Sequence, residues 1–416
     1  MKEGRGRNRS TPPRTGAMQP GVRRPADLDI DAPLPAGDPG LERRLRAEIQ
    51  AHGPMTFARF MELALYDLDS GYYTGLAADE PDERGPGRRG DFLTAPEGHP
   101  IFGWAIARHL EALWAALGRP ARFVVREHGA GTGALATGIL DGLRRAGSPL
   151  LQALAYQAID AAPARMDVLR TNLAAAGLDD RLEAATDVPE PGAILANELL
   201  DALPVHRVEG AADGRLLERL VEVRPDGTLG ETGAAPSTPA LAQRLAAEDI
   251  RLAPGQVAEI CLALDGWVAD AARCLERGEL LLIDYGHEGA QLYAAERGST
   301  LRAYHRHRVH ANPFVAIGRQ DLTAHVDLTA VARAAGAAGL QALGRTTQAR
   351  FLDGLGIGEL LVDLQSLPTT TLASYLEAKS ALVRMLDPRA TGGFAVLGFG
   401  RGLPTEPPLR GFGTAR

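Results

Sequence analysis

Short apolar runs alternate with segments of helical periodicity from Ala121 onward. The runs at about 122–127, 155–160, 193–197 and 279–286 predict strands, and a weaker run lies near 182–184. Segments with apolar residues at helical spacing, such as 134–146 and 165–176, predict helices between them. This alternation is typical of a parallel sheet with crossover helices, so we predict an α/β fold.

Six segments are predicted along the chain: a disordered tail (1–38), an N-terminal helical region (39–120), the first part of the core (121–204), a β-rich insertion with a helical return (205–262), the second part of the core with C-terminal helices (263–402) and a frayed tail (403–416). The first tail is rich in Arg, Pro and Gly, a composition that does not favour a packed core. Asp213-Gly214, between two strand-like runs, is a hairpin signal and marks the insertion.

Composition and charge narrow the class of protein. The 416 residues carry a formal net charge of −7, which argues against a broad basic surface for nucleic acid. No apolar run reaches the roughly 18 residues of a membrane span, so we expect no membrane insertion. Cys261 and Cys274 have no Cys or His cluster beside them, which indicates a reducing compartment and no metal site. We expect a cytoplasmic protein, or a mitochondrial-matrix protein if the chain is eukaryotic.

The segment Glu127–Gly133 places an acid and three alternating glycines directly after a predicted strand. A strand, a glycine turn and a helix start together let a nucleoside-bearing ligand approach the backbone. The N–H groups of Gly129, Gly131 and Gly133 could meet a carboxylate of such a ligand. The spacing is G-x-G-x-G, whereas the dinucleotide fingerprint is G-x-G-x-x-G, so the turn favours S-adenosylmethionine over a nicotinamide cofactor. A tight turn without a ligand is the alternative.

Four polar residues stand at the ends of predicted strands: Glu127, Asp160, Asn197 and Asp284. Ligands of open α/β sheets bind outside the carboxyl ends of the strands, so these side chains are candidates for one crevice. A carboxylate at Asp160 can accept both hydroxyls of a ribose, one on each oxygen. Its alternative role is to cap the helix that follows.

Two acids follow the strand at 193–197, in the run Asn197-Glu198-Leu199-Leu200-Asp201. On one side of a helical turn, Glu198 and Asp201 can hold a guanidinium by charge-assisted hydrogen bonds and orient its nitrogen for attack. Helix capping and surface solvation are the alternative for both acids. A separate stretch, 302–310, mixes arginine and histidine and suits an anion or a partner.

These motifs resemble the MidA-like S-adenosylmethionine-dependent methyltransferases, whose mitochondrial members are arginine methyltransferases that assist respiratory complex I assembly. The resemblance spans roughly residues 45–400. It is carried by Gly53-Pro54-Met55-Thr56-Phe57, Gly71-Tyr72-Tyr73, the segment 90–97, Phe102-Gly103, the glycine turn, the segment 197–205, Asp284-Tyr285-Gly286, and the segments 321–327 and 347–352.

The resemblance implies a doubly wound, seven-stranded Rossmann-like methyltransferase core with an N-terminal helical region and an inserted β-rich subdomain. The implied cofactor is S-adenosyl-L-methionine. Its implied binding residues are Glu127, Gly129, Ala130, Gly131, Gly133, Asp160 and Asn197, with Gly90, Asp91 and Thr94 in a covering segment. His128 departs from the apolar residue usual in this family, and we expect its side chain to point away from the ligand.

The predicted function is methyl transfer from S-adenosylmethionine to a protein side chain, with arginine as the first choice and Glu198 and Asp201 as the catalytic residues. The expected partner is a protein substrate, and the resemblance implies a respiratory complex subunit; we expect no nucleic acid, and the oligomeric state is left open. Two other classes stay open: a non-catalytic assembly chaperone with this fold, and a nicotinamide-dependent oxidoreductase.

Overall fold

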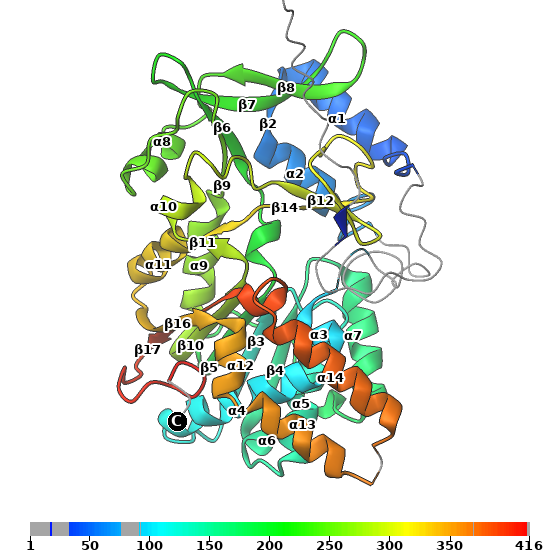
Figure 1. Ribbon diagram of the computed structural model, residues 1–416, viewed down its shortest axis with the longest axis vertical. Coiled ribbons are helices and arrows are strands. Elements are labelled where there is room, and N and C mark those ends of the chain that lie inside the picture. The colour runs from blue at the N-terminus through cyan, green and yellow to red at the C-terminus, as the bar shows by residue number, and fades with distance from the viewer. Residues whose placement is uncertain (1–16, 19–32, 76–90, 92, 369, 414–416) are drawn as a thin grey trace, which may run out of the picture.

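The computed structural model describes residues 17–18, 33–75, 91, 93–368 and 370–413. In Figure 1 a large sheet with its helices forms the lower part of the molecule, and smaller sheets with the first two helices form the upper part. Most of the predicted disordered tail, and the last residues of the predicted frayed tail, lie outside the described residues.

The large sheet has six strands in the order β16-β17-β10-β5-β3-β4. The strands are β3 (Phe123–His128), β4 (Leu154–Ile159), β5 (Glu190–Asn197), β10 (Leu275–Asp284), β16 (Gln341–Thr347) and β17 (Ala395–Arg401). β4, β3, β5 and β10 run parallel, whereas β17 is antiparallel to both of its neighbours. The predicted α/β fold is confirmed. The weak strand expected near 182–184 makes a single parallel bridge, between Leu182 and Tyr156.

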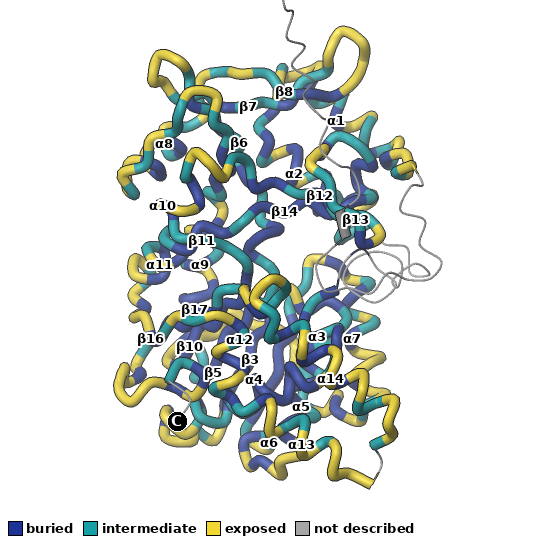
Figure 2. Tube along the Cα trace, in the orientation of Figure 1, coloured by how far each residue is buried: buried dark blue, intermediate teal, exposed yellow. Residues whose placement is uncertain are grey.

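Helices cover both faces of this sheet. Ala193 and Leu195 of β5 pack on one face and Ile194 and Ala196 on the other, as the period of a strand requires. The first face carries α4 (Ile101–Ala116), α5 (Ala134–Arg145), α7 (Pro163–Ala176), α12 (Gln348–Gly354), α13 (Ile357–Ser366) and α14 (Leu372–Leu386). The second face carries α9 (Ala263–Arg273) and α11 (Leu328–Ala337). Burial on both faces, seen as dark strands in Figure 2, explains why the strands read as continuous apolar runs.

The strand register brings four carboxyl ends level. His128 of β3 lies beside Ile159 of β4, and Asn197 of β5 lies beside Ile283 of β10. The polar residues predicted to end these strands therefore meet at one edge of the sheet. This edge faces the upper part of the molecule (Figure 1).

The predicted insertion forms most of a five-stranded antiparallel sheet, in the order β2-β7-β6-β9 with β8 beside β7. Its elements are β2 (Met55–Thr56), β6 (His206–Gly210), β7 (Leu216–Val223), β8 (Leu229–Ala234), α8 (Ala240–Ala246) and β9 (Val257–Ile260). The expected hairpin at Asp213-Gly214 is confirmed, because it joins β6 to β7 and Gly214 has a φ of +83°. β2 comes from the N-terminal region, so that region and the insertion share one sheet.

The first two helices, α1 (Pro39–His52) and α2 (Phe57–Tyr66), pack against this sheet and against residues 301–324. Asp38 caps α1 and Thr56 caps α2. α4 was grouped with these helices in the predicted N-terminal region, but it packs on α5 and the large sheet. The upper part is thus assembled from three distant stretches of the chain.

The arginine- and histidine-rich stretch forms β12 (Arg302–His305) and β13 (Arg308–His310), an antiparallel pair. β14 (Asp321–Thr323) pairs with β12, and β1 (Ala17–Met18) pairs with β13. The remaining elements are α3 (Ala95–Gly98), α6 (Leu150–Ala153), α10 (Gly289–Leu292), β11 (Gly286–His287), β15 (Val326–Asp327) and the short 3-10 turns η1 (Asp179–Arg181), η2 (Leu200–Ala202) and η3 (Thr391–Gly393).

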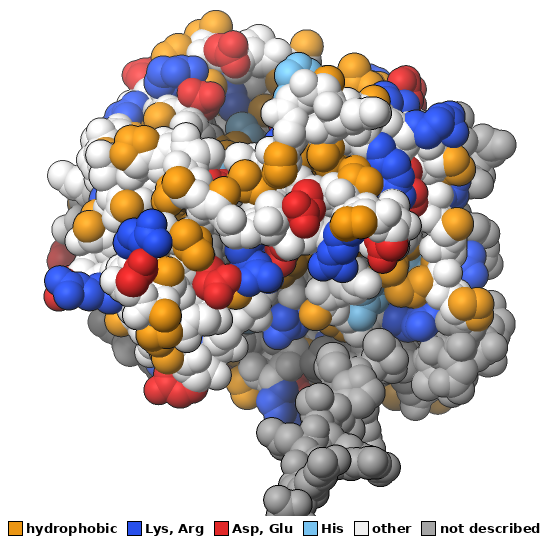
Figure 3. All heavy atoms as spheres, turned by 90° about the horizontal axis from the view of Figure 1, so that it is seen from above, with side chains coloured by type: hydrophobic (Ala, Val, Ile, Leu, Met, Phe, Trp, Pro, Cys, Tyr) orange, Lys and Arg blue, Asp and Glu red, His pale blue; other side chains and the backbone are white. Residues whose placement is uncertain are grey.

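Acidic and basic side chains are interspersed on the face seen in Figure 3, in keeping with the modest net charge of −7. Across the described ranges, the structure has no helix that is both long and apolar enough to cross a bilayer.

Candidate functional site

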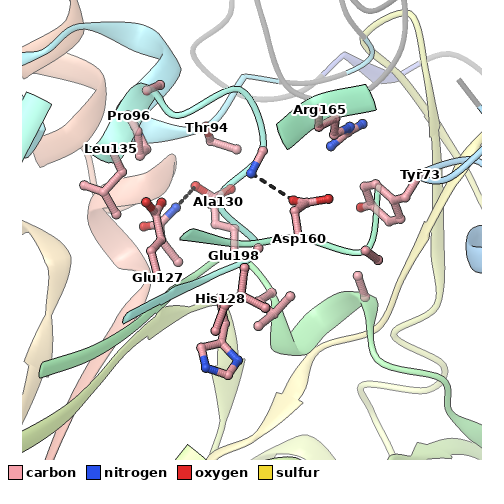
Figure 4. Close-up of a pocket in the computed structure, with 18 of the residues that line it drawn as sticks. Tyr73, Thr94, Pro96, Glu127, His128, Ala130, Leu135, Asp160, Arg165 and Glu198 are labelled. Carbon is pink, nitrogen blue, oxygen red and sulfur yellow. Dashed lines mark hydrogen bonds between the residues drawn. The ribbon is translucent and has the colours of Figure 1, made fainter. Parts of the chain in front are cut away.

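A cavity of about 280 Å³, the first cavity, opens at the carboxyl ends of β3, β4 and β5. Figure 4 shows side chains from several elements converging on it. Seven of the predicted cofactor-binding residues line it: Glu127, Gly129, Ala130, Gly131, Asp160, Asn197 and Thr94. The predicted residues therefore gather at one cavity, which is also lined by residues that received no prediction.

The glycine turn depends on backbone conformations that favour glycine. Gly129, Gly131 and Gly133 have φ values of +72°, +54° and +83°. A Cβ at Gly131 would meet no atom within 4 Å, whereas one at Gly133 would lie 2.7 Å from Cγ of Leu169. Gly131 thus borders open space in the first cavity, and Gly133 instead caps α5 and packs against α7.

The N–H groups of the three glycines and of Ala130 already have protein acceptors. Gly129 and Ala130 donate to the carbonyl oxygen of Ile159 at 2.8 and 3.2 Å, and Gly133 donates to that of Ala130 at 2.9 Å. Gly131 donates to Oδ2 of Asp160 at 2.9 Å, a bond drawn in Figure 4. The expectation that the three glycine N–H groups meet a ligand carboxylate is therefore wrong. A ligand carboxylate in this cavity needs another donor.

Asp160 combines the two roles considered for it. Its Oδ2 accepts from Gly131, and its Oδ1 accepts from the backbone N–H of Ala162 at 2.9 Å, at the start of α7. Each carboxylate oxygen has two acceptor sites, so these bonds leave capacity for two hydroxyl donors. The capping role and a ribose-binding role are compatible.

Glu127 lines the first cavity from the end of β3. It is buried, and its Oε2 accepts a hydrogen bond of 2.6 Å from the hydroxyl of Tyr156. Burial, together with the negative charge of Asp160, raises the pKa of Glu127 to about 8. Without a cationic ligand, this carboxyl group is therefore mostly protonated at neutral pH.

Asn197 offers an unused acceptor in the same cavity. Its Nδ2 donates to Oε1 of Glu198 at 3.2 Å. Its Oδ1 is buried and has no hydrogen-bond partner in the described part of the chain. Because buried polar atoms in native proteins are almost always paired, this oxygen indicates a missing donor such as an amino group. This unmet acceptor, the open space at Gly131 and the acid at Asp160 fit an aminoacyl nucleoside.

The remaining predicted positions differ in outcome. Asp91 does not line the first cavity, because it is buried and accepts hydrogen bonds from the Tyr72 hydroxyl at 2.6 Å and the Arg306 N–H at 2.5 Å. It ties its segment to the β12–β13 turn instead. His128 borders the first cavity, but its ring is directed away from Glu127 and Asp160 in Figure 4 and lies 5.4 Å from that of Trp267. Gly90 lies outside the described residues.

A second cavity, of about 250 Å³, shares Tyr73 and Glu198 with the first. Three carboxyl groups line it, those of Glu198, Asp201 and Asp321. Three tyrosines also line it: Tyr73, Tyr285 and Tyr304. The two acids predicted to be catalytic therefore meet in one cavity, beside the cavity that contains the predicted cofactor residues.

Glu198 stands in the wall common to both cavities. Its φ of +52° is rare for a residue with a side chain, and such strain costs on the order of 1–3 kcal/mol and concentrates at functional sites. Its Oε1 accepts hydrogen bonds from Asn197 and, at 3.4 Å, from the N–H of Ala95. Burial, aided by the charge of Asp201, raises the pKa of Glu198 to about 8.

The other acids of this region have distinct positions. Asp284 lines neither cavity; its Oδ2 accepts from the N–H groups of Leu200 and Asp201 at 2.8 and 3.3 Å and so holds the η2 turn. Burial raises the pKa of Asp201 to about 6, and burial plus the charge of Asp201 raises that of Asp321 to about 8. Within the described residues, no arginine or lysine forms an ion pair with Glu198, Asp201 or Asp321. Arg389 also lines the second cavity, but it is exposed and pairs with Asp387 at 3.0 Å. The three acids, unpaired with any cation in the described chain, therefore make the second cavity suited to a cation.

Sequence reasoning gave no role to several residues that line the two cavities. Tyr73, Tyr285 and Asp321 belong to motifs that carried the family resemblance, but no binding or catalytic role was predicted for them. Arg165, on the first turn of α7, lines the first cavity and carried no signal beyond its charge.

Comparisons with known proteins agree with this geometry. Residues 105–346, more than half of the chain, match the family of S-adenosyl-L-methionine-dependent methyltransferases. A mitochondrial protein of Drosophila melanogaster, named as a homologue of the protein arginine methyltransferase NDUFAF7, is 30% identical over 345 residues, 76% of this chain and 74% of that protein. Mouse NDUFAF7 is 29% identical over 343 residues, again 76% of this chain and 74% of that protein.

A solved structure has a similar fold over almost its whole length. A Burkholderia thailandensis protein bound to S-adenosyl-homocysteine is 33% identical and superposes with a TM-score of 0.79, covering 91% of this chain and 98% of the other. The match to a methyltransferase family argues against the nicotinamide alternative. The chain belongs to the S-adenosyl-L-methionine-dependent methyltransferases, with S-adenosyl-L-methionine as its cofactor.

Proposed function

We propose that this enzyme transfers a methyl group from S-adenosyl-L-methionine to a guanidinium nitrogen of an arginine side chain in a protein. The observation that carries the proposal is the acidic second cavity, which shares Glu198 with the first. A guanidinium is a planar cation with five N–H donors, and carboxylates are its best-matched partners. The fly and mouse relatives are named as protein arginine methyltransferases, which supports the same acceptor.

In this proposal the first cavity holds the cofactor. Asp160 accepts the ribose hydroxyls, and Oδ1 of Asn197 accepts from the amino group. Glu127, Gly129, Ala130, Gly131 and Thr94 form the surrounding wall. When bound, S-adenosyl-L-methionine supplies an electrophilic methyl group on a sulfonium. Gly133 contributes the turn and not a contact.

Glu198 and Asp201 act on the acceptor in the second cavity. Both of the protein hydrogen bonds to Glu198 reach Oε1, which leaves Oε2 to accept N–H groups of the arginine. This grip orients one guanidinium nitrogen toward the first cavity, and Oε2 takes the proton that this nitrogen gives up. Positioning and the exclusion of water by the buried walls supply most of the rate enhancement.

The raised pKa values of the acceptor acids make the second cavity selective for charge. Glu198 and Asp321, each with a pKa of about 8, are largely neutral at pH 7 when no cation is near. An arriving guanidinium favours their charged forms and lowers these pKa values. A neutral side chain of similar shape gains no such interaction, so the cavity discriminates against it.

The proposal extends to the sheet, the cellular compartment and the protein substrate. We propose that the bridge at Leu182 is the remnant of a seventh strand of a doubly wound sheet, and that the segments 121–204 and 263–402 form one catalytic core interrupted by 205–262. The relatives are named as mitochondrial proteins, which favours the mitochondrial matrix for a eukaryotic source and gives the cytoplasmic expectation no support. A respiratory complex subunit is the proposed protein substrate.

Methyl labelling of an extract tests the proposal. The enzyme and methyl-tritiated S-adenosylmethionine are added to a lysate from cells that lack this protein, and the labelled band is hydrolysed to amino acids. We expect tritium in methylarginine. Label in methyllysine or in base-labile esters would reject arginine as the acceptor, and cofactor binding without any label would favour the chaperone alternative.

A further inference from the structure

The first cavity contains a buried cation that has no hydrogen-bond or ion-pair partner among the described residues. Arg165 is the only arginine or lysine among the described residues that line it, and only 6% of its surface is exposed. Its guanidinium carbon lies 5.2 Å from the ring centroid of Tyr73, and Figure 4 shows the side chain above Asp160 and Tyr73. Its guanidinium forms no hydrogen bond or ion pair in the described chain, and Nη2 is fully buried.

Such an arginine is unusual for a structural residue. A buried guanidinium normally satisfies its N–H groups with carboxylates or carbonyls, because leaving them unpaired forfeits their hydration. Arg126, buried in β3, shows the usual arrangement: its nitrogens donate to the carbonyl oxygens of Cys274 at 2.7 Å and Val188 at 2.6 Å. The contrast indicates that the partner of Arg165 is a ligand.

The charges in the first cavity indicate which group of the ligand pairs with Arg165. Four acids line the cavity, those of Glu97, Glu127, Asp160 and Glu198, against the single guanidinium. S-adenosylmethionine has two cationic groups, its sulfonium and its ammonium, and one anionic group, its carboxylate. The N–H groups of Gly129, Gly131 and Gly133 donate to protein acceptors, so these glycines do not supply the donors for that carboxylate.

We propose that Arg165 binds the carboxylate of the methionine moiety of S-adenosylmethionine by charge-assisted hydrogen bonds. This inference rests on the proposed location of the cofactor in the first cavity. The guanidinium lies over the ring of Tyr73, and the same residue borders the second cavity, where its hydroxyl donates to Asp321. Arg165 therefore anchors the amino-acid end of the cofactor next to the wall that separates it from the acceptor.

Calorimetric titration with two ligands that differ only in the carboxylate tests this role. The ligands are S-adenosylmethionine and decarboxylated S-adenosylmethionine, and the proteins are the full-length wild type and Arg165→Met. We expect the wild type to prefer S-adenosylmethionine, and the substitution to raise its Kd about tenfold to a hundredfold. The Kd of the decarboxylated ligand should change by less than about threefold.

Matched variants separate this role from effects on the fold. Arg170→Met removes another arginine of α7, one that is exposed and paired with Asp167, and should leave both affinities unchanged. Arg165→Lys keeps the charge and the packing of the stem; it should weaken S-adenosylmethionine alone and serves if Arg165→Met does not fold. Far-UV circular dichroism checks each variant.

Two results would overturn the inference. If substitution of Arg165 weakens both ligands equally, the residue contacts the nucleoside or supports the fold, and if it weakens neither, it has no role in binding. If the cofactor does not bind in the first cavity at all, the result is different. Gly131→Val, made in an otherwise wild-type protein, would then leave the binding of S-adenosylhomocysteine intact.

Discussion

The hydroxyl of Tyr73 donates a hydrogen bond of 2.8 Å to Oδ1 of Asp321, although the two residues are 248 positions apart in the chain. Tyr73 lines both cavities, and Asp321 lines only the second. This bond favours the charged form of Asp321 and lowers its pKa against the opposing effect of burial. The wall between the two cavities thus also adjusts the charge of the acceptor site.

Removing this hydroxyl should weaken acceptor binding and spare the cofactor. Tyr73→Phe keeps the ring that lies beside Arg165 but loses the donor, so the pKa of Asp321 rises further and an arriving guanidinium ionises this acid less readily. A neutral–charged hydrogen bond is worth about 1.5–3 kcal/mol, so we expect KM for the protein acceptor to rise about tenfold or more. Steady-state methylation at saturating cofactor measures it. Tyr375→Phe, which lines neither cavity, is the control, and an unchanged KM in Tyr73→Phe would remove this bond from the account.

The glycine turn should reject a side chain at Gly131. A valine there places a branched Cβ at a φ of +54° and fills the open space of the first cavity, so binding of S-adenosylhomocysteine should fall by more than a hundredfold. Gly214→Val provides a matched control, because Gly214 also has a positive φ, +83°, and open space around a Cβ, but lies in the β6–β7 hairpin. Equal binding by the two variants in calorimetry would refute the site.

The buried acids should make the ligand-free protein less stable as the pH rises. Glu127, Glu198 and Asp321 have folded-state pKa values of about 8, against roughly 4 in an unfolded chain. Between these values the folded state binds more protons than the unfolded state, so the free energy of unfolding decreases from pH 5 to pH 8. Thermal unfolding of the wild type should show Tm falling across this range.

Asp321→Asn isolates one of these groups. The amide cannot ionise, so the variant should lose less Tm than the wild type between pH 5 and pH 8. Asp213→Asn, at the exposed tip of the β6–β7 hairpin, should keep the wild-type slope. A Tm that rises with pH in the wild type, or identical slopes in wild type and Asp321→Asn, would show that Asp321 titrates normally.

Local sequence signals predicted the part of the site that is contiguous in the chain. The acid and glycines of 127–133 follow directly from a strand, a turn and a helix, and Asp160 and Asn197 end neighbouring strands of the same sheet. Their meeting needed only the rule that parallel strands end at one edge. Glu198 and Asp201 were found for the same reason, because they follow β5 without interruption.

The second cavity could not be predicted in this way. Its acid Asp321 is on β14. Its tyrosines come from three other places: Tyr73 follows α2, Tyr285 follows β10 directly, and Tyr304 is on β12. These segments are brought together by packing between the two parts of the molecule, which no local periodicity encodes. The prediction for Asp91 was wrong for a related reason. Its hydrogen-bond partners, Tyr72 and Arg306, are distant in sequence, and they hold its side chain outside the first cavity.

The role of Glu198 at the boundary of the two cavities is the centre of this account, and single-turnover methylation measures it most directly. Wild type and Glu198→Gln are loaded with methyl-tritiated S-adenosylmethionine to equal occupancy and mixed with the acceptor protein found by labelling. We expect the wild type to form tritiated methylarginine, and Glu198→Gln, which should bind the cofactor within about twofold of wild type, to form it at least a hundredfold more slowly. Methylarginine formation at the wild-type rate by Glu198→Gln would contradict it.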